Sequence, residues 1–175
     1  MKIYLAGSIP KGKQEEENFF DWRENYKEVL EKTLKAELIT PLADIDEADF
    51  LLVVGNDSKN IRNSDLVIVN AQEKLGAGTS MEMVIAKYFK KPVVAILPKN
   101  SYHRRPNLTF QNKYFVSDWI HPFIHTFSDF IIEKISDIQN IKDQIFKTTA
   151  KDISIVDQAI AHLDSNKAHN KKGHV

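Results

Sequence analysis

The 175-residue chain contains no cysteine. This absence excludes a disulfide framework, a zinc site held by thiolates and catalysis by a thiolate nucleophile. Neither sign of charge is in excess, because 24 lysines and arginines are balanced by 24 aspartates and glutamates. A protein that coats nucleic acid or an anionic membrane needs a surplus of positive charge, so we expect neither partner.

Long hydrophobic runs are missing as well. No segment approaches the ~20 consecutive apolar residues that a membrane-spanning helix requires. The apolar run at residues 3–6 is too short for a signal peptide. The composition, with 42% hydrophobic and 27% charged residues, is that of a folded protein. We therefore expect a cytoplasmic protein with one main domain.

Short apolar segments alternate with amphipathic ones along the chain. The apolar segments predict buried strands at residues 3–6, 37–41, 66–69, 92–97 and 123–127. Apolar residues at helical spacing predict helices over residues 14–34, 49–63, 79–89, 128–146 and 152–163. Strands without polar alternation, separated by helices, are typical of a parallel sheet covered on both faces. The sequence therefore predicts a doubly wound, mainly parallel, five-stranded α/β fold of the flavodoxin-like type over residues 1–146.

Three regions fit this pattern less well. Residues 50–54 are β-branched enough for a strand, although their surroundings favour a helix. Residues 99–122 are polar and lack clear periodicity, which is typical of a functional segment or an interface, and we expect a second copy of the chain to bind there. Residues 147–175 are expected to form a C-terminal helix and a disordered basic tail.

His121 and His125 are four residues apart, but the proline between them argues against a metal site.

The segment after the first predicted strand is placed to bind a ligand, because ligands of open α/β sheets bind beyond the carboxyl ends of the strands. It contains Gly7, Ser8, Lys11, Gly12 and Lys13. Small residues let backbone N–H groups approach an anion, and the hydroxyl and the lysines add donors and charge. The segment has neither the Walker pattern nor the glycine fingerprint of dinucleotide-binding domains, so a simple solvated turn is an equally open interpretation.

A second segment, residues 76–83, follows the strand at residues 66–69. Thr79 and Glu82 have the spacing of a capping box, in which the glutamate closes back onto the backbone N–H of the cap residue. Alternatively, Glu82 presents a carboxylate at the edge of the sheet, where it can attack the anomeric carbon of a sugar. Spacing alone leaves both interpretations open.

Four short stretches together resemble the nucleoside 2-deoxyribosyltransferase family, which includes 2'-deoxynucleoside 5'-monophosphate N-hydrolases. The stretches are residues 3–9, 56–68, 78–83 and 91–93. The resemblance implies cleavage of the N-glycosidic bond of (deoxy)nucleosides or their 5'-monophosphates. It also implies a homo-oligomer, such as a dimer, and a mechanism that needs no metal and no other cofactor.

The resemblance assigns catalytic roles to three residues. Glu82 falls on the nucleophilic glutamate of the family, which attacks C1' and holds the sugar as a glycosyl ester. Tyr4 falls on a tyrosine that orients this carboxylate, and Asp57 falls on an aspartate that contacts or protonates the leaving base. Water resolves the ester in a hydrolase, and a second base resolves it in a transferase.

The resemblance also indicates where the substrate binds. Ser8 and the glycines around it fall where the hydrolase branch holds the 5'-phosphate. Gly76 is a departure, because family members often carry Asp or Ser six residues before the nucleophile, and this leaves the choice between nucleoside and nucleotide open. The predicted substrate-binding residues are Gly7, Ser8, Ile9, Lys11, Asn70, Gly76, Gly78, Thr79 and Ser80.

Two other functions remain open. The run from Gly76 to Glu82 also resembles the second half of the glycine-rich motif of cytokinin-activating phosphoribohydrolases, although residues 72–75 lack the double glycine and proline that open that motif. A domain of this architecture can also bind nucleotides without catalysis, because the fold alone does not confer activity.

Overall fold

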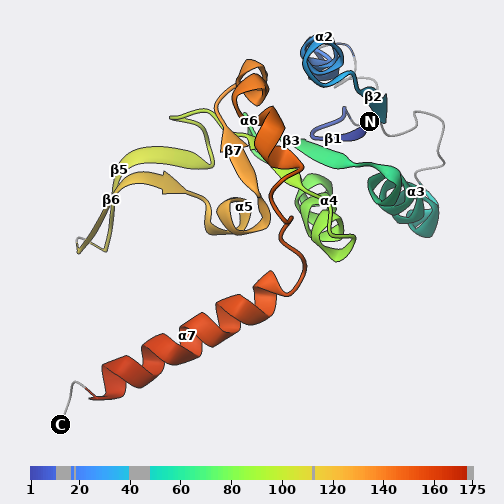
Figure 1. Ribbon diagram of the computed structural model, residues 1–175. Helices are drawn as coiled ribbons and strands as arrows, with labels where there is room; N and C mark the ends of the chain where they lie inside the picture. Colours follow the sequence, from blue (N-terminus) through green and yellow to red (C-terminus); the bar gives the residue numbers. More distant parts are fainter. Residues whose placement is uncertain (11–16, 18, 40–47, 112, 173–175) are drawn as a thin grey trace.

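A five-stranded parallel sheet lies at the centre of the molecule (Figure 1). The computed structural model describes residues 1–10, 17, 19–39, 48–111 and 113–172, with side chains as far as residue 166. The strands of the sheet are β1 (Lys2–Ala6), β2 (Glu37–Ile39), β3 (Leu66–Asn70), β4 (Val93–Ile96) and β7 (Phe130–Ile132). Their order is β2-β1-β3-β4-β7, so the direction of winding reverses between β1 and β3. This is the predicted doubly wound, flavodoxin-like arrangement, and the predicted fold class is confirmed.

Helices cover both faces of the sheet (Figure 1). One face packs against α2 (Trp22–Leu34) and α6 (Ile138–Ile145). The other face packs against α3 (Phe50–Asn63), α4 (Ala77–Tyr88) and α5 (Pro122–Phe127). The central strands read as continuous apolar runs because both of their faces are buried.

The alternation of side chains along β1 decides which residues can reach which helices. Ile3 and Leu5 belong to the core under α2 and α6. Tyr4 and Ala6 belong to the core under α3, α4 and α5. The ring of Tyr4 therefore lies on the side of the sheet that also carries Asp57 and Glu82.

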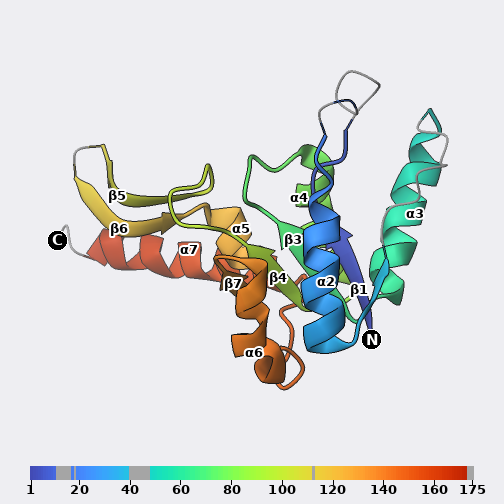
Figure 2. The ribbon, with the colours of Figure 1, turned by 90° about the horizontal axis from the view of Figure 1, so that it is seen from above.

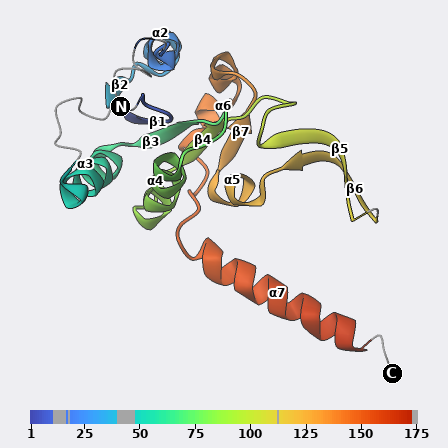
Figure 3. The ribbon, with the colours of Figure 1, turned by 180° about the vertical axis from the view of Figure 1, so that it is seen from behind.

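Two elements extend from the α/β body on the side of β7 (Figures 2 and 3). One is an antiparallel hairpin of β5 (Arg104–Phe110) and β6 (Tyr114–Ile120), in the region where the sequence shows no periodicity. Most of its residues are exposed on both faces, which explains why no apolar alternation marks it. The other is α7 (Ile155–Lys172). The basic tail, which the sequence analysis expected to be disordered, is therefore helical as far as Lys172, its last described residue. None of the described helices is long and apolar enough to span a membrane.

The prediction of a strand at residues 123–127 is wrong. This segment is α5, which begins with Pro122 at a position that suits proline and buries Ile124 and Phe127 on one side. The last strand, β7, lies inside the predicted helix over 128–146, of which only α6 and a short 3-10 turn (Ile135–Asp137) are helical. Short apolar runs carry too few residues for helical and extended periods to be distinguished.

Two predicted helices begin at other residues than expected. The helix predicted from residue 14 begins at Trp22, because the side chain of Asp21 accepts a hydrogen bond from the backbone N–H of Arg23 and caps it. The helix predicted from Thr79 begins at Ala77, with Gly76 as its N-cap. The predicted helix over 49–63 matches α3, whose cap is Asp49.

A buried ion pair ties the C-terminal part of the chain to the sheet. Lys87 on α4 is fully buried, and its ammonium group donates hydrogen bonds to the carboxylate of Asp129 and the carbonyl of Lys91. Asp129 also accepts hydrogen bonds from the backbone N–H groups of Val93 and Lys151. Because Val93 begins β4, this network lies at the amino end of the sheet, opposite the edge where ligands of such folds bind.

Candidate active site

Two side chains from distant parts of the sequence meet beside β1. Tyr4 is fully buried, and Glu82 on α4 is 8% exposed. The hydroxyl of Tyr4 donates a hydrogen bond to Oε1 of Glu82 over 2.5 Å. The contact is possible because Tyr4 points to the face of the sheet on which α4 packs.

The capping box suggested by the spacing of Thr79 and Glu82 does not form. Because α4 begins at Ala77, Glu82 lies in the second turn of the helix, beyond reach of the helix end, and the N-cap residue is Gly76, which has no side chain to cap the helix. Its carboxylate turns towards Tyr4 instead. Of the two interpretations of this motif, the structure therefore supports a carboxylate presented within a site.

Asp57 on α3 is the third member of this group. Its carboxylate is half-buried and accepts a hydrogen bond of 3.3 Å from the side-chain amide of Asn56. It lies close enough to Tyr4 and Glu82 for its charge to raise the pKa values of both. The structure thus brings the three predicted catalytic residues together from a strand and two different helices.

Burial governs the protonation of these groups. It raises the pKa of Glu82 to about 7, against the hydrogen bond from Tyr4, which favours the ionised form. Burial also raises the pKa of Asp57, and hydrogen bonds from Asn56 and Tyr4 oppose this shift. The pKa of Tyr4 is raised well above its usual value, first by burial and then by the charge of Glu82, so the phenol stays a proton donor.

Arg23 is a charged residue near Glu82 that the sequence did not single out. It lies in the first turn of α2, its side chain is 11% exposed, and Nη1 is 3.1 Å from Oδ1 of Asp21. Its positive charge lowers the pKa of Glu82. Nε is buried and has no hydrogen-bond partner in the part of the chain that the structure describes. The helix predicted from residue 14 put Arg23 in a helix interior, where no sequence signal singles it out.

The turn after β1 depends on a glycine. A Cβ atom on Gly7 would lie 2.5 Å from the ring of Trp22, closer than packed atoms approach, so no larger residue fits without movement. The indole N–H of Trp22 donates a hydrogen bond of 3.1 Å to the carbonyl of Ser8. Trp22 therefore holds this turn in place from the side of α2.

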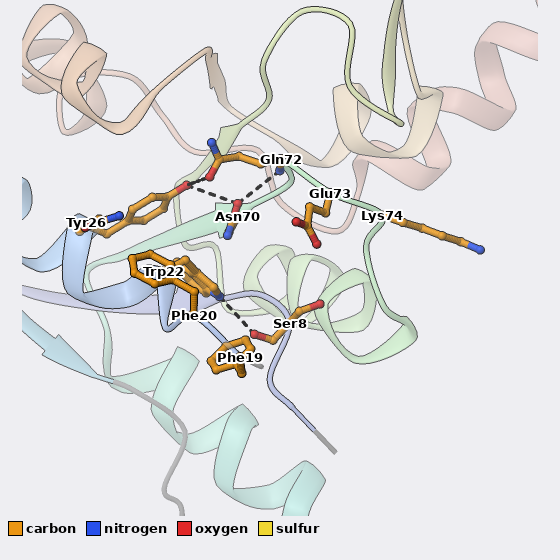
Figure 4. Close-up of a pocket in the computed structure, with 10 residues that line it drawn as sticks. Ser8, Phe19, Phe20, Trp22, Tyr26, Asn70, Gln72, Glu73 and Lys74 are labelled. Atoms are coloured by element: carbon orange, nitrogen blue, oxygen red, sulfur yellow. Dashed lines mark hydrogen bonds between the residues drawn. The ribbon is translucent and has the colours of Figure 1, made fainter. Parts of the chain in front are cut away.

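A cavity of about 430 Å³ opens next to this turn, where the strand order reverses between β1 and β3 (Figure 4). Ser8 and Asn70, two of the predicted substrate-binding residues, line it. Asn70 accepts a hydrogen bond of 3.3 Å from the hydroxyl of Tyr26, which lies on α2. Trp22 and Tyr26 also line the cavity, and the sequence had assigned neither of them a role in binding.

The other predicted substrate-binding residues lie near the start of α4 or after β1. Gly76 and Gly78 have open space around them, since a Cβ atom on either would meet no atom within 4 Å. Thr79 is buried, and the hydroxyl of Ser80 donates to the carbonyl of Gly76 over 3.0 Å. Ile9 is 40% exposed.

The structure does not cover three residues of the predicted ligand-binding segment after β1. Lys11, Gly12 and Lys13 lie outside the described residues. Within the described ranges, no group of three or more His, Asp or Glu side chains is arranged to hold a metal ion.

Two enzymes are among the solved structures that match the chain. The 2-deoxyribosyltransferase of Bacillus psychrosaccharolyticus matches with a TM-score of 0.53 and 18% identity, over 80% of this chain and 91% of that one. The CMP N-glycosidase BcmB of Clostridium botulinum matches with a TM-score of 0.44 and 18% identity, over 82% and 99% of the two chains. No protein-family model and no curated protein sequence matches the chain. The first comparison defines the class: the chain has the doubly wound α/β fold of a nucleoside deoxyribosyltransferase.

Proposed function

We propose that this protein cleaves the N-glycosidic bond of (deoxy)nucleosides or their 5'-monophosphates, with Glu82 as the nucleophile. The observation that carries the proposal is the buried hydrogen bond of 2.5 Å between Tyr4 and Glu82, with Asp57 beside them. Glycosidic cleavage through a covalent intermediate needs one oriented carboxylate and a second acidic group. The fold shared with a 2-deoxyribosyltransferase supports the same chemistry.

In the first step, a carboxylate oxygen of Glu82 attacks C1' of the sugar. A C–O bond forms while the C1'–N bond breaks, and the electron pair of the broken bond leaves with the base. Tyr4 holds Oε1, whereas Oε2 receives no hydrogen bond from any described residue and is the atom we assign to the attack. Because Tyr4 holds Oε1, the direction of Oε2 is also fixed. This lowers the entropy cost of bringing Oε2 to C1' of the sugar.

Asp57 supplies the proton that the departing base needs. Burial raises its pKa, and a second carboxylate next to it makes simultaneous ionisation of both acids unfavourable. Glu82, whose pKa is about 7, is the acid that holds the proton first, so the reactive form, with Glu82 ionised and Asp57 protonated, arises when that proton passes to Asp57. Water or a second base then attacks C1' of the ester, the C1'–O bond to Glu82 breaks, and Asp57, ionised after the first step, takes up the proton that the attacking molecule loses.

The substrate is proposed to lie between the turn after β1 and the start of α4. Open space at Gly76 and Gly78 gives a sugar or its 5' group access to the backbone there. The residues assigned to substrate binding are Gly7, Ser8, Ile9, Lys11, Asn70, Gly76, Gly78, Thr79 and Ser80.

The decisive experiment incubates the purified chain with a panel of nucleosides and 5'-monophosphates, with and without an acceptor base, and measures released base by chromatography. The variants Glu82→Ala and Glu82→Gln should release no base while their circular dichroism stays that of the parent. Glu31→Gln, an exposed glutamate on α2, is the matched control and should keep full activity. Undiminished release by Glu82→Gln would remove this residue from the mechanism.

We also propose that the protein acts as a homodimer, whose interface involves the hairpin and α7. Tyr114 and Phe115 on the hairpin are 66% and 65% exposed, and Ile160 and Leu163 on α7 are 53% and 52% exposed. The hairpin and α7 both extend from the body (Figure 3). Large exposed apolar side chains on such elements are typical of surfaces that oligomers bury. Sedimentation should give the mass of a dimer, and Ile160→Asp with Leu163→Asp should give a monomer. A monomeric parent at assay concentration would refute this.

A further inference from the structure

An imidazole ring at the base of the hairpin contacts the segment that leads into α4. Nε2 of His103 accepts a hydrogen bond of 2.9 Å from the backbone N–H of Leu75. Leu75 comes directly before Gly76, the N-cap residue of α4. His103 lies 28 residues further along the chain, directly before β5. The bond therefore joins the hairpin to the backbone from which the helix of Glu82 starts.

This segment is held from two sides. The carbonyl of Gly76 accepts hydrogen bonds from the backbone N–H of Ser80 over 3.1 Å and from its hydroxyl over 3.0 Å. On the other side, His103 holds the N–H of Leu75, whose side chain packs against the core under α3, α4 and α5. The backbone of Leu75 and Gly76 is thus fixed at both ends, next to the open space at Gly76 and Gly78.

The ring of His103 is itself held in place. It is 7% exposed and packs edge to face against the rings of Tyr102 and His121, at 4.8 and 5.4 Å between centroids. The carbonyl of His103 accepts a hydrogen bond of 2.8 Å from the backbone N–H of His121. The side chain of Arg104 donates to the carbonyl of Leu97 over 3.3 Å, which ties the base of the hairpin to the end of β4. The acceptor nitrogen therefore belongs to a fixed part of the fold.

The hydrogen bond to Leu75 requires the neutral imidazole. A ring nitrogen that accepts carries no hydrogen, so the hydrogen of the neutral ring is on Nδ1. Burial lowers the pKa of His103, and the charges of His121 and Lys74 lower it further. The surroundings of the ring thus favour the form that can accept from Leu75.

Packing alone does not account for a histidine at this position. Nδ1 of His103 is buried and has no hydrogen-bond partner among the described residues. A buried donor without a partner costs free energy, and a phenylalanine ring would fill similar space without that cost. The acceptor at Nε2 is the feature that an apolar ring could not supply.

We propose that His103 is a positioning residue, which holds the backbone of Leu75 and Gly76 in the conformation that receives the sugar or its 5' group. This role rests on the proposed function, because the segment is part of the substrate-binding region proposed there. His103 acts through the backbone and takes part in no bond change or proton transfer. Its loss should weaken substrate binding and leave the chemical step largely intact, because Tyr4 orients Glu82 without it.

NMR spectroscopy can detect the hydrogen bond in the parent protein. In an isotope-labelled sample, a scalar coupling across the bond should connect the amide nitrogen of Leu75 with Nε2 of His103. The amide hydrogen of Leu75 should exchange slowly with solvent in the parent and about tenfold faster in His103→Phe, which keeps an aromatic ring but has no acceptor. Absence of the coupling from the parent, or an unchanged exchange rate in His103→Phe, would overturn the proposal.

Kinetics test whether the held segment serves the substrate. His103→Phe should raise KM for base release about tenfold and leave kcat nearly unchanged. His103→Gln should restore most of the lost binding, because its amide oxygen can accept the same hydrogen bond. His125→Gln, at an exposed position on α5, is the matched control and should behave as the parent.

Two kinetic results would contradict the positioning role. A fall in thermal stability of His103→Phe with an unchanged KM would show that the ring is only structural. An equal rise of KM in His103→Gln and His103→Phe would show that the acceptor is not the cause. Either result would overturn the proposal.

The two kinds of measurement separate this role from the proposed function. If the parent releases no base from any nucleoside or 5'-monophosphate, the proposed function fails. The coupling, together with exchange of Leu75 that is slow in His103→Gln and fast in His103→Phe, would then still support the hold of His103 on this segment. Base release with an unchanged KM in every variant would leave the proposed function intact and overturn the role of His103.

Discussion

The hydroxyl of Tyr4 and the carboxylate of Glu82 are 78 residues apart in the sequence and are joined by a buried hydrogen bond of 2.5 Å. The strand places one partner and the second turn of α4 places the other. In a buried site this contact both orients the carboxylate and stabilises its ionised form. The behaviour of Glu82 should therefore respond to changes at each of its neighbours.

Tyr4→Phe removes the hydrogen bond and keeps the ring. Because the hydroxyl favours the ionised carboxylate, the pKa of Glu82 should rise in the variant. The lower limb of the pH profile of kcat should move to higher pH, and kcat at its maximum should fall by about one to two orders of magnitude as orientation is lost. A lower rate with an unshifted profile would show that Tyr4 does not influence the ionisation of Glu82.

Glu82→Gln should change how stability depends on pH. The folded-state pKa of Glu82 is about 7 against a usual value of 4.5, so its contribution to stability is complete below the usual value and is lost as pH rises through about 7. The shift corresponds to about 3 kcal/mol. Urea unfolding should show this loss in the parent between about pH 4.5 and about pH 7, and the loss should be absent in the variant. Parallel curves for the two proteins would contradict the raised pKa.

Arg23→Gln removes the positive charge that favours the ionised carboxylate of Glu82. The pKa of Glu82 should rise, so activity should fall more below pH 7 than above it. Arg23→Lys keeps the charge and should preserve most of the profile, although it loses the planar guanidinium. An equal loss of activity at every pH in Arg23→Gln would indicate a role other than electrostatic support.

Asp129→Asn should weaken the fold without touching the site. The change leaves the buried ammonium of Lys87 without its carboxylate and should cost about 3 kcal/mol in the free energy of unfolding. Asp143→Asn, at an exposed position on α6, is the control and should change stability little. Adding Lys87→Met to Asp129→Asn should recover part of the loss, and no recovery would mean that the unpaired charge is not its cause.

Much of the fold could be predicted because parallel strands that are buried on both faces appear in the sequence as uniformly apolar runs. The runs at residues 3–6, 66–69 and 92–97 are uniformly apolar, and each became a strand of the sheet. The hairpin has no such apolar run, because most of its residues are exposed on both faces. The segment 123–127 was misassigned because Ile124 and Phe127 occupy a single helical turn, too short for its period to be recognised.

The periodicity of the sequence by itself determined the α/β class, and the family resemblance carried by its short motifs gave the candidates Tyr4, Asp57 and Glu82. They could do so because local periodicity and short motifs depend on neighbouring residues only. The tertiary structure alone decided that Glu82 turns to Tyr4 instead of capping its helix, and that Arg23 lies near enough for its charge to lower the pKa of Glu82. These relations depend on how helices dock on the sheet, and contacts between residues so far apart in the chain arise only from packing.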